Sequence, residues 1–251
     1  MAKRIRVLLA GESWTTILTE IKGLDSFTQH GYGEGARWLK EALEKNGIEV
    51  THMPCHKAIT DFPMSVKALG EYDCVILSDI GTNTLLLHPE VSMLSKRKPN
   101  RLKVIRDYVR GGGALIMIGG YLTFQGIDGK ARYHGTPVEE ALPVEISPYD
   151  DRAEVPEGFR AVAAAKGHPI TRGLPARFPL MLFYNRVKAK AGAAVLLRNK
   201  RDPILAVWDF GKGRSAAFAP DAAPHGATPE FLNWRYFGAF WARLVRWLCR
   251  K

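Results

Sequence analysis

The chain has 251 residues, of which 46 % are hydrophobic and 24 % are charged, and its formal net charge is +11. These proportions are ordinary for a globular protein and supply a sizeable core, and the length suits a single domain over residues 1–251. No apolar run approaches the roughly 20 residues that cross a bilayer, which argues against a membrane-spanning protein.

Strands and helices alternate in the first half of the chain. Apolar or alternating runs predict strands, and apolar residues at helical spacing predict helices. The expected strands are 5–10, 48–53, 73–78 and 114–118, and the expected helices are 34–46 and 100–110. Such alternation predicts an α/β protein with a mostly parallel sheet covered by helices on both faces.

The second half is less regular. Residues 126–186 are rich in Pro and Gly, and we expect a long surface excursion that carries short strands. Three strands should follow, and Gly211-Lys-Gly213 predicts a tight hairpin between the last two. The remaining expected elements are strands at 193–198, 204–210 and 214–219, and a docked helix at 229–249.

The three cysteines are widely spaced and odd in number. Cys55, Cys74 and Cys249 fit neither a disulfide framework nor a zinc motif, so a reducing cytoplasm is the simplest compartment. Because His-x-x-x-His spacing is absent, we expect no metal, and nothing in the sequence calls for a cofactor.

The basic residues are scattered, with their densest cluster at 96–103. No helix-turn-helix, zinc finger or RNA-binding motif accompanies that cluster, so nucleic acid is not the expected partner. The same charge would attract an anionic small molecule.

Polar side chains follow several predicted strands, and ligands of open α/β sheets collect beyond the carboxyl ends of the strands. The turn 119–125 follows a buried strand and places Tyr121 at its apex, where α/β enzymes commonly carry a nucleophile. We therefore expect a site at this edge with catalytic candidates Tyr121, His225, Asp221 and Asp79, and ligand-binding candidates Glu12, Ser13, Gly120 and Gln125.

Other candidates lie elsewhere in the sequence. Asp150, Asp151, Arg152 and Glu154 form an acidic group in the expected excursion, which could bind a cation or a polyol or be a self-paired charged loop. His30 precedes a helix N-terminus that could attract an anion. Cys55 adjoins His56, but neighbouring residues of an extended segment point in opposite directions and do not make a ready catalytic pair.

The motif Gly119-Gly-Tyr-Leu-Thr-Phe-Gln125 resembles the Gly-x-Cys-x-Gly-x-Gln elbow of class I glutamine amidotransferases. Tyr121 stands at the cysteine position and Thr123 at the second glycine. His225 resembles the family histidine, but Ala227 stands where the family has glutamate.

Features along the whole chain, including residues 11–14, 77–81, 150–152, 211–214 and 221–225, resemble a bacterial family labelled as glutamine amidotransferases. That family belongs to a superfamily that also contains proteins of the trehalose-utilisation type. The resemblance implies a flavodoxin-like three-layer sandwich with a small-molecule ligand.

Glutamine hydrolysis in that superfamily requires a thiolate that histidine activates. A phenol with a pKa near 10 replaces it poorly at neutral pH. We therefore expect an enzyme acting on a small polar or carbohydrate-like metabolite, with standard glutaminase activity lost. The alternative is a non-catalytic module that binds a ligand or mediates homo-oligomer contacts.

Overall fold

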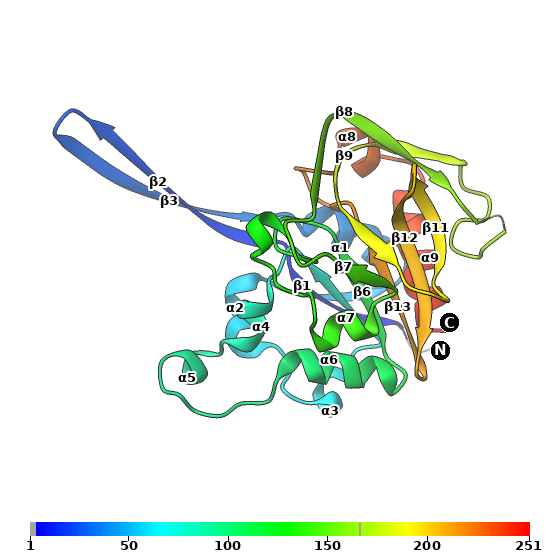
Figure 1. Cartoon of the computed structure of the whole chain (residues 1–251), viewed down its shortest axis with the longest axis horizontal. Coiled ribbons are helices and arrows are strands. Elements are labelled where there is room, and N and C mark those ends of the chain that lie inside the picture. Colours follow the sequence, from blue (N-terminus) through cyan, green and yellow to red (C-terminus); the bar gives the residue numbers. More distant parts are fainter. Residues whose placement is uncertain (1–3, 166) are drawn as a thin grey trace.

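The structure is a computed structural model that describes residues 4–165 and 167–251. Within these residues a nine-stranded sheet has the order β4-β1-β5-β6-β13-β12-β11-β8-β9 (Figure 1). Its first five strands are parallel: β4 (Glu49–Met53), β1 (Arg6–Gly11), β5 (Cys74–Ser78), β6 (Ala114–Ile118) and β13 (Gly213–Phe218). Numbered in chain order, these five follow the arrangement 2-1-3-4-5 of flavodoxin-like folds. The predicted fold class is confirmed.

The other four strands are antiparallel and continue the sheet: β12 (Asp202–Phe210), β11 (Ala194–Asn199), β8 (Arg152–Ala163) and β9 (Arg177–Asn185). The expected hairpin at Gly211 joins β12 to β13. Residues 126–186 differ from the surface excursion expected, because β8 and β9 are long strands at the edge of the main sheet. Pro156 and Gly158 interrupt the alternation of β8, and the pairing shifts register there, which hid the strand in the sequence.

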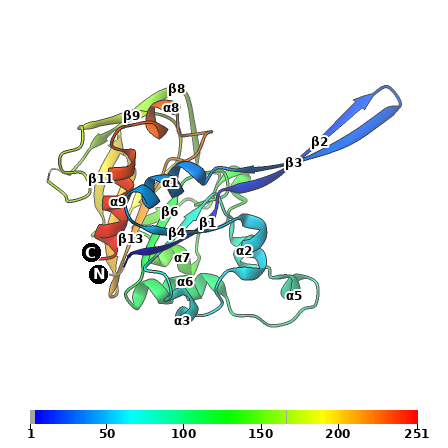
Figure 2. The ribbon, with the colours of Figure 1, turned by 180° about the vertical axis from the view of Figure 1, so that it is seen from behind.

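Helices cover both faces of the sheet (Figure 2). On one face α1 (Arg37–Lys45) packs against α9 (Phe237–Leu248). On the other lie α2 (Cys55–Asp61), α4 (Thr82–Leu86) and α6 (Arg101–Arg110), the last capped by the side chain of Asn100. Across the described ranges, no helix has the length and apolar character needed to cross a membrane.

The helix expected at 229–249 is divided into α8 (Pro229–Leu232) and α9, with Asn233 ending the first part. The shorter elements are α3 (Val66–Leu69), α5 (Pro89–Ser92), α7 (Pro137–Ala141), the 3₁₀ turn η1 (Ile127–Gly129), and the small sheet of β7 (Val144–Ile146) and β10 (Val187–Ala189).

The parallel strands form the centre of the core. Every residue of β5 and β6 is buried, as continuous apolar runs covered on both faces should be. The aromatic rings of Phe240 and Trp241 on α9 pack against Phe218 at the end of β13. This packing fixes the strand ends on which the candidate site is built.

One large element was not predicted. β2 (Ser13–Lys22) and β3 (Asp25–Glu34) form an antiparallel hairpin that projects from the body as an arm (Figures 1 and 2). We call residues 13–34 the arm. Its turn is Gly23-Leu24, and Gly at the first position of a two-residue loop is a known hairpin signal. The sequence places His30 just before a helix N-terminus, whereas the structure places it within the strand β3.

Candidate active site at the carboxyl edge of the sheet

A pocket of about 470 Å³ lies where β1 and β5 end. β4 pairs with one side of β1 and β5 with the other, so this is the switch point at which open α/β sheets bind ligands. The pocket brings together five of the predicted site residues. It is lined by Glu12, Trp14, Asp79, Tyr121, Leu122, Ile127, Asp221, Ala223, Pro224 and His225.

The turn after β6 depends on close backbone packing. A Cβ at Gly119 would lie 1.9 Å from the carbonyl oxygen of Ala219, so only glycine fits. The chain then passes Tyr121 and reaches the short η1 turn, with no α-helix following β6 directly. The turn therefore differs from the strand–turn–helix elbow that presents a nucleophile in α/β hydrolases.

Asp79 accepts a hydrogen bond from the backbone of this turn. The Leu122 N–H donates to Asp79 Oδ1 at 2.7 Å. In a nucleophile elbow, the N–H of the residue after the nucleophile belongs to the oxyanion hole. Here the Leu122 N–H is bonded to the carboxylate of Asp79, which follows the neighbouring strand β5. Burial raises the pKa of Asp79, and nearby Asp221 adds to the increase.

Glu12 is a buried acid in the same pocket. Its side chain accepts a hydrogen bond from Ser78 Oγ at 2.6 Å. Burial holds the pKa of Glu12 well above its usual range, and the charges of Asp221 and Asp79 act in the same direction. The site therefore favours a protonated Glu12, which is a hydrogen-bond donor as well as an acceptor.

Tyr121, His225 and Asp221 form a contiguous group. The ring centroids of Tyr121 and His225 are 4.2 Å apart, and His225 Nδ1 lies 3.4 Å from Asp221 Oδ2. The contact with Asp221 is the main cause of a raised His225 pKa. Burial and the charge of Glu154 raise the pKa of Tyr121, which keeps the phenol protonated.

Three of these ionisable residues have unusual backbone conformations. The φ angles are 50° at Glu12, 44° at Asp79 and 151° at His225. Positive φ in residues other than glycine costs of order 1–3 kcal/mol each, and it clusters at functional sites. The strain provides an argument for function that is independent of the pocket itself.

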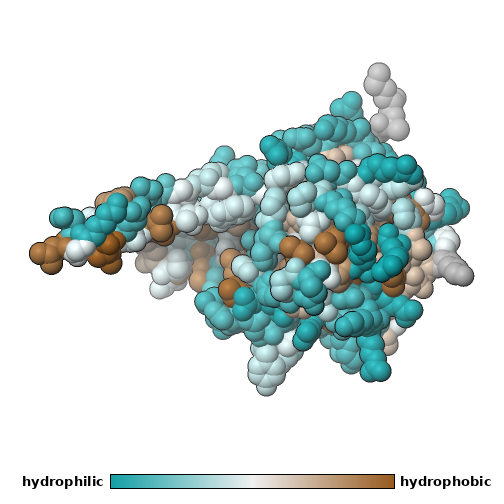
Figure 3. Space-filling model, turned by 90° about the horizontal axis from the view of Figure 1, so that it is seen from above, coloured by the Kyte–Doolittle hydropathy of each residue, from teal (hydrophilic) through white to brown (hydrophobic). Residues whose placement is uncertain are grey.

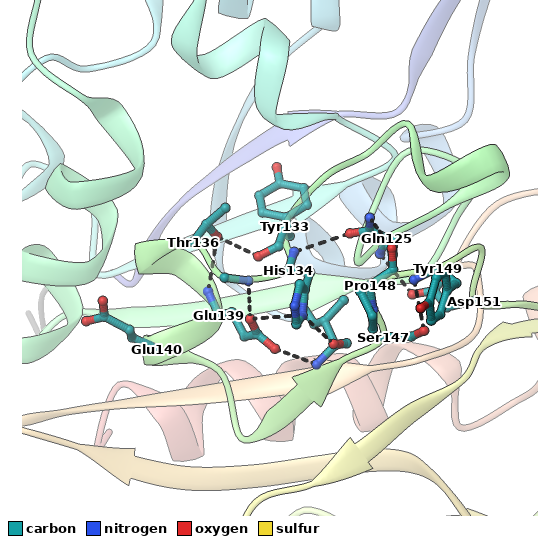
Figure 4. Close-up of polar contacts among 12 residues, drawn as sticks. Gln125, Tyr133, His134, Thr136, Glu139, Glu140, Ser147, Pro148, Tyr149 and Asp151 are labelled. Atoms are coloured by element: carbon teal, nitrogen blue, oxygen red, sulfur yellow. Dashed lines mark hydrogen bonds and ion pairs between the residues drawn. The ribbon is translucent and has the colours of Figure 1, made fainter.

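Gln125 and Asp151 lie behind the turn, outside the pocket lining. The Gln125 carboxamide donates to the Pro148 carbonyl at 3.2 Å and accepts from the His134 N–H at 3.3 Å (Figure 4). The Asp151 carboxylate accepts the N–H groups of Gln125 and Gly126, at 2.8 and 2.9 Å. These side chains brace the turn.

The remaining predicted ligand-binding residues are also outside the pocket lining. Ser13 Oγ accepts from the Cys55 N–H at 2.7 Å, and the Gly120 N–H donates to Asn185 Oδ1 at 3.0 Å. Arg152 lies over the Tyr121 ring at 5.4 Å and is paired with Asp150. His30 lies out on the exposed arm, opposite Ile17 and away from the pocket.

All three cysteines are free thiols. Cys55 is near the pocket, and its Sγ lies 3.7 Å from the Asp79 carbonyl oxygen. Burial raises the pKa of the Cys55 thiol, which disfavours the thiolate. No cluster of three or more metal-binding side chains occurs in the described part of the chain.

Several residues of the site escaped sequence reasoning. Asn185 is fully buried and contacts both Gly120 and Asp151 from β9. Phe183 packs on the His225 ring with centroids 4.9 Å apart, and Glu154 Oε2 lies 3.9 Å from His225 Nε2. Glu154 was visible only as part of an acidic group, and no local signal pointed to the two residues of β9.

The fold and the pocket define an amidotransferase-like α/β protein. A family described as "putative glutamine amidotransferase" matches residues 6–250, and the chain belongs to that family.

Two solved structures are similar over nearly their whole length. A cytoplasmic protein from Salmonella typhimurium is 42 % identical, with a TM-score of 0.93, and the match covers 96 % of this chain and 98 % of that one. A second, from Salmonella typhimurium LT2, is 40 % identical with a TM-score of 0.94, covering 97 % and 99 %.

A ThuA-like protein from Parabacteroides merdae is 13 % identical, with a TM-score of 0.59 and coverage of 98 % and 90 %, and it supports the fold relation to trehalose-utilisation-type proteins. No curated protein sequence matches the chain.

Proposed function

We propose that this protein acts on a small polar or carbohydrate-like metabolite by acid–base chemistry and does not hydrolyse glutamine. The observation that supports this proposal most directly is the hydrogen bond from the Leu122 N–H to Asp79. It places a carboxylate against the donor that an amidotransferase would need for an oxyanion, beside a tyrosine at the position where the elbow of class I glutamine amidotransferases has cysteine. The raised Cys55 pKa also argues against that thiol as a substitute nucleophile.

The roles of the pocket residues follow from their protonation. His225, held by Asp221, is poised to donate a proton, and Tyr121 supplies a phenol donor next to it. Asp79 can accept a proton or a hydroxyl hydrogen bond. A ligand with several hydroxyl groups would use this mixture of donors and acceptors, and the apolar side chains of Leu122 and Ile127 would contact its carbon skeleton.

The cellular setting proposed is the cytoplasm. Three free thiols suit a reducing compartment, and both Salmonella relatives are described as cytoplasmic proteins.

A non-catalytic binding module is the second candidate. The observation that favours it is the packing of the Tyr121 ring, which contacts Phe183, His225 and Arg152 and fills the space above the turn. In that case the pocket binds its ligand without converting it.

The test has two parts. Ammonia release from glutamine should stay at the level of protein-free buffer. In thermal unfolding with a panel of monosaccharides, sugar acids and polyols, a ligand should raise the Tm of the wild type and of Tyr149→Phe, an exposed control, but not of Tyr121→Phe or His225→Gln. Glutamine turnover, or a Tm shift that both pocket variants retain, would contradict the proposal. Product formation then separates the enzyme from the binding module.

A further inference from the structure

The arm exposes an apolar surface that no other part of residues 4–165 and 167–251 covers. Hydrophobic side chains of the arm are strongly exposed, and they gather toward its outer end (Figure 3). Leu24 at the turn is 105 % exposed and Ile21 is 75 % exposed. An isolated two-stranded hairpin is marginally stable in water and needs a further surface to pack on.

On one face of the arm, Glu34 at the base is the only residue with a carboxylate or ammonium group. The arm's side chains alternate along both strands, so this face presents Thr15, Ile17, Thr19, Ile21, Ser26, Thr28, His30 and Tyr32. The base is anchored: the Tyr32 ring packs on His56 at 5.5 Å, and Ser13 bonds to Cys55. The outer part stands clear of the body in both ribbon views.

The charge of the arm is opposite to that of the body. Residues 13–34 contain one Lys against three carboxylates, a net charge of −2 in a chain of +11, so the other residues carry +13. At the outer end, Glu20 and Asp25 flank the apolar residues Ile21 and Leu24. Lys22 pairs with Glu20 at 3.2 Å, so residues 20–25 keep a net charge of −1. A partner surface should therefore be apolar with a basic rim.

The chain itself offers such a surface. A pocket of about 520 Å³ lies between α5 and the segment that follows it, and we call it the socket. Leu86 and Val91 supply its apolar lining and Lys96, Arg97 and Lys98 its basic lining. Glu90 pairs with Lys96 and Lys98, whereas Arg97 is exposed. Beside it Met93 and Leu94 are exposed by 80 % and 60 %.

We propose that the arm docks into the socket of a second copy of this chain, in a two-fold symmetric dimer with exchanged arms. Arm and α5 project from the same side of the body (Figure 1). In the projection of Figure 1, a two-fold axis normal to the view sets each arm opposite the partner's α5, the arrangement that an isologous interface requires.

The dimensions suit this assembly. Ten paired residues per strand span about 30 Å, enough to reach across to a neighbouring molecule. Each protomer contributes the outer part of its arm and the eight residues of its socket, which is of the order of the roughly 20–30 residues on each side of a stable interface.

The first test measures the dimer Kd of the full chain by sedimentation equilibrium. The wild type should dimerise at micromolar concentration, and Ile21→Ser with Leu24→Ser should raise the Kd by at least about tenfold through loss of apolar burial. Tyr149→Ser, an exposed aromatic outside arm and socket, is the matched control. A monomeric wild type, or an unchanged Kd in the double variant, would overturn the proposal; a foreign protein would then be the arm's occupant.

The second test exchanges charges. Glu20→Lys with Asp25→Lys sets a basic arm against a basic socket, and Lys96→Glu with Arg97→Glu sets an acidic socket against an acidic arm. Each variant alone should be monomeric, whereas their mixture should form heterodimers in which both contacts are complementary. If mixing restored no dimer, arm and socket would not be partners.

Discussion

The turn at 119–126 and the arm at 13–34 differ in how far the rest of the chain covers them and forms hydrogen bonds with them. Side chains hold the turn from two sides, with the half-buried Asp79 in front and the buried Asp151 and Asn185 behind. The arm exposes apolar side chains and two strand edges that pair with no other strand among the described residues. A rigid, enclosed turn suits recognition of a small molecule, whereas an open hairpin suits recognition of a macromolecular surface. Variants in the two regions should therefore report on different properties.

The largest effect is expected behind the turn. Asn185→Ala removes hydrogen bonds to both sides of Gly120 and to Asp151 and leaves these buried groups unpaired. We expect a loss of about 3 kcal/mol in the free energy of unfolding, measured by urea titration. Asn83→Ala, exposed on α4, is the control and should change it by less than about 0.5 kcal/mol. An equal effect of both variants would mean that the turn is not specially braced.

Glu12→Gln should stabilise the protein at neutral pH by about 1 kcal/mol. The amide oxygen can still accept from Ser78, and a neutral amide removes the free-energy cost of keeping a buried acid protonated at neutral pH. A folded pKa above the usual 4.5 means that wild-type stability falls as pH rises from 4.5 through the folded value. The variant should lack that decline in thermal unfolding across the same pH range, and Glu157→Gln, which is exposed, should retain it.

Asp221→Asn should lower the pKa of His225, because the carboxylate contact is the main cause of its increase. A folded pKa above 6.5 stabilises the protein fully below pH 6.5, and this contribution is lost as pH rises through the folded value. The stability difference between wild type and variant should therefore shrink at high pH. NMR titration of the imidazole, assigned with His225→Gln, measures the pKa directly. Asp209→Asn, on β12, should leave it unmoved.

The smallest effect is expected at the arm. Leu24→Ser should change the unfolding free energy of the monomer by no more than about 0.5 kcal/mol, because the side chain is fully exposed there. The measurement is made at a protein concentration below the dimer Kd. A large loss in the monomer would show that Leu24 packs against its own chain and would remove the contrast with the turn.

The sequence predicted the parallel half of the sheet well. Continuous apolar runs such as 114–118 are long, unambiguous and bounded by glycine, so both the strand and the turn after it were placed correctly. The five pocket residues followed from strand ends alone. The arm was missed because its strands mix polar and apolar residues on both faces, as in Thr15-Thr-Ile-Leu-Thr19, without the alternating pattern of a half-buried strand.

Contacts between distant segments could not be predicted. Asn185 reaches Gly120 across 65 positions in the sequence, and nothing local to either residue marks the pair. The same holds for Asp79 and Leu122, whose hydrogen bond decides how the turn is interpreted. Gln125 was assigned to ligand binding by its place in the motif, and its carboxamide instead bonds to the backbone behind the turn.

Trp14 belongs to both regions: it lines the pocket and opens the arm, where its ring lies over Gly33. A Cβ at Gly33 would come within 2.6 Å of that ring, so the indole position depends on this glycine. Any tilt of the arm therefore moves a wall of the pocket. Because the proposed dimer holds the arm in place, the rates at which a ligand enters and leaves the pocket should depend on protein concentration. Trp14 fluorescence should change with the position of the arm even without a ligand.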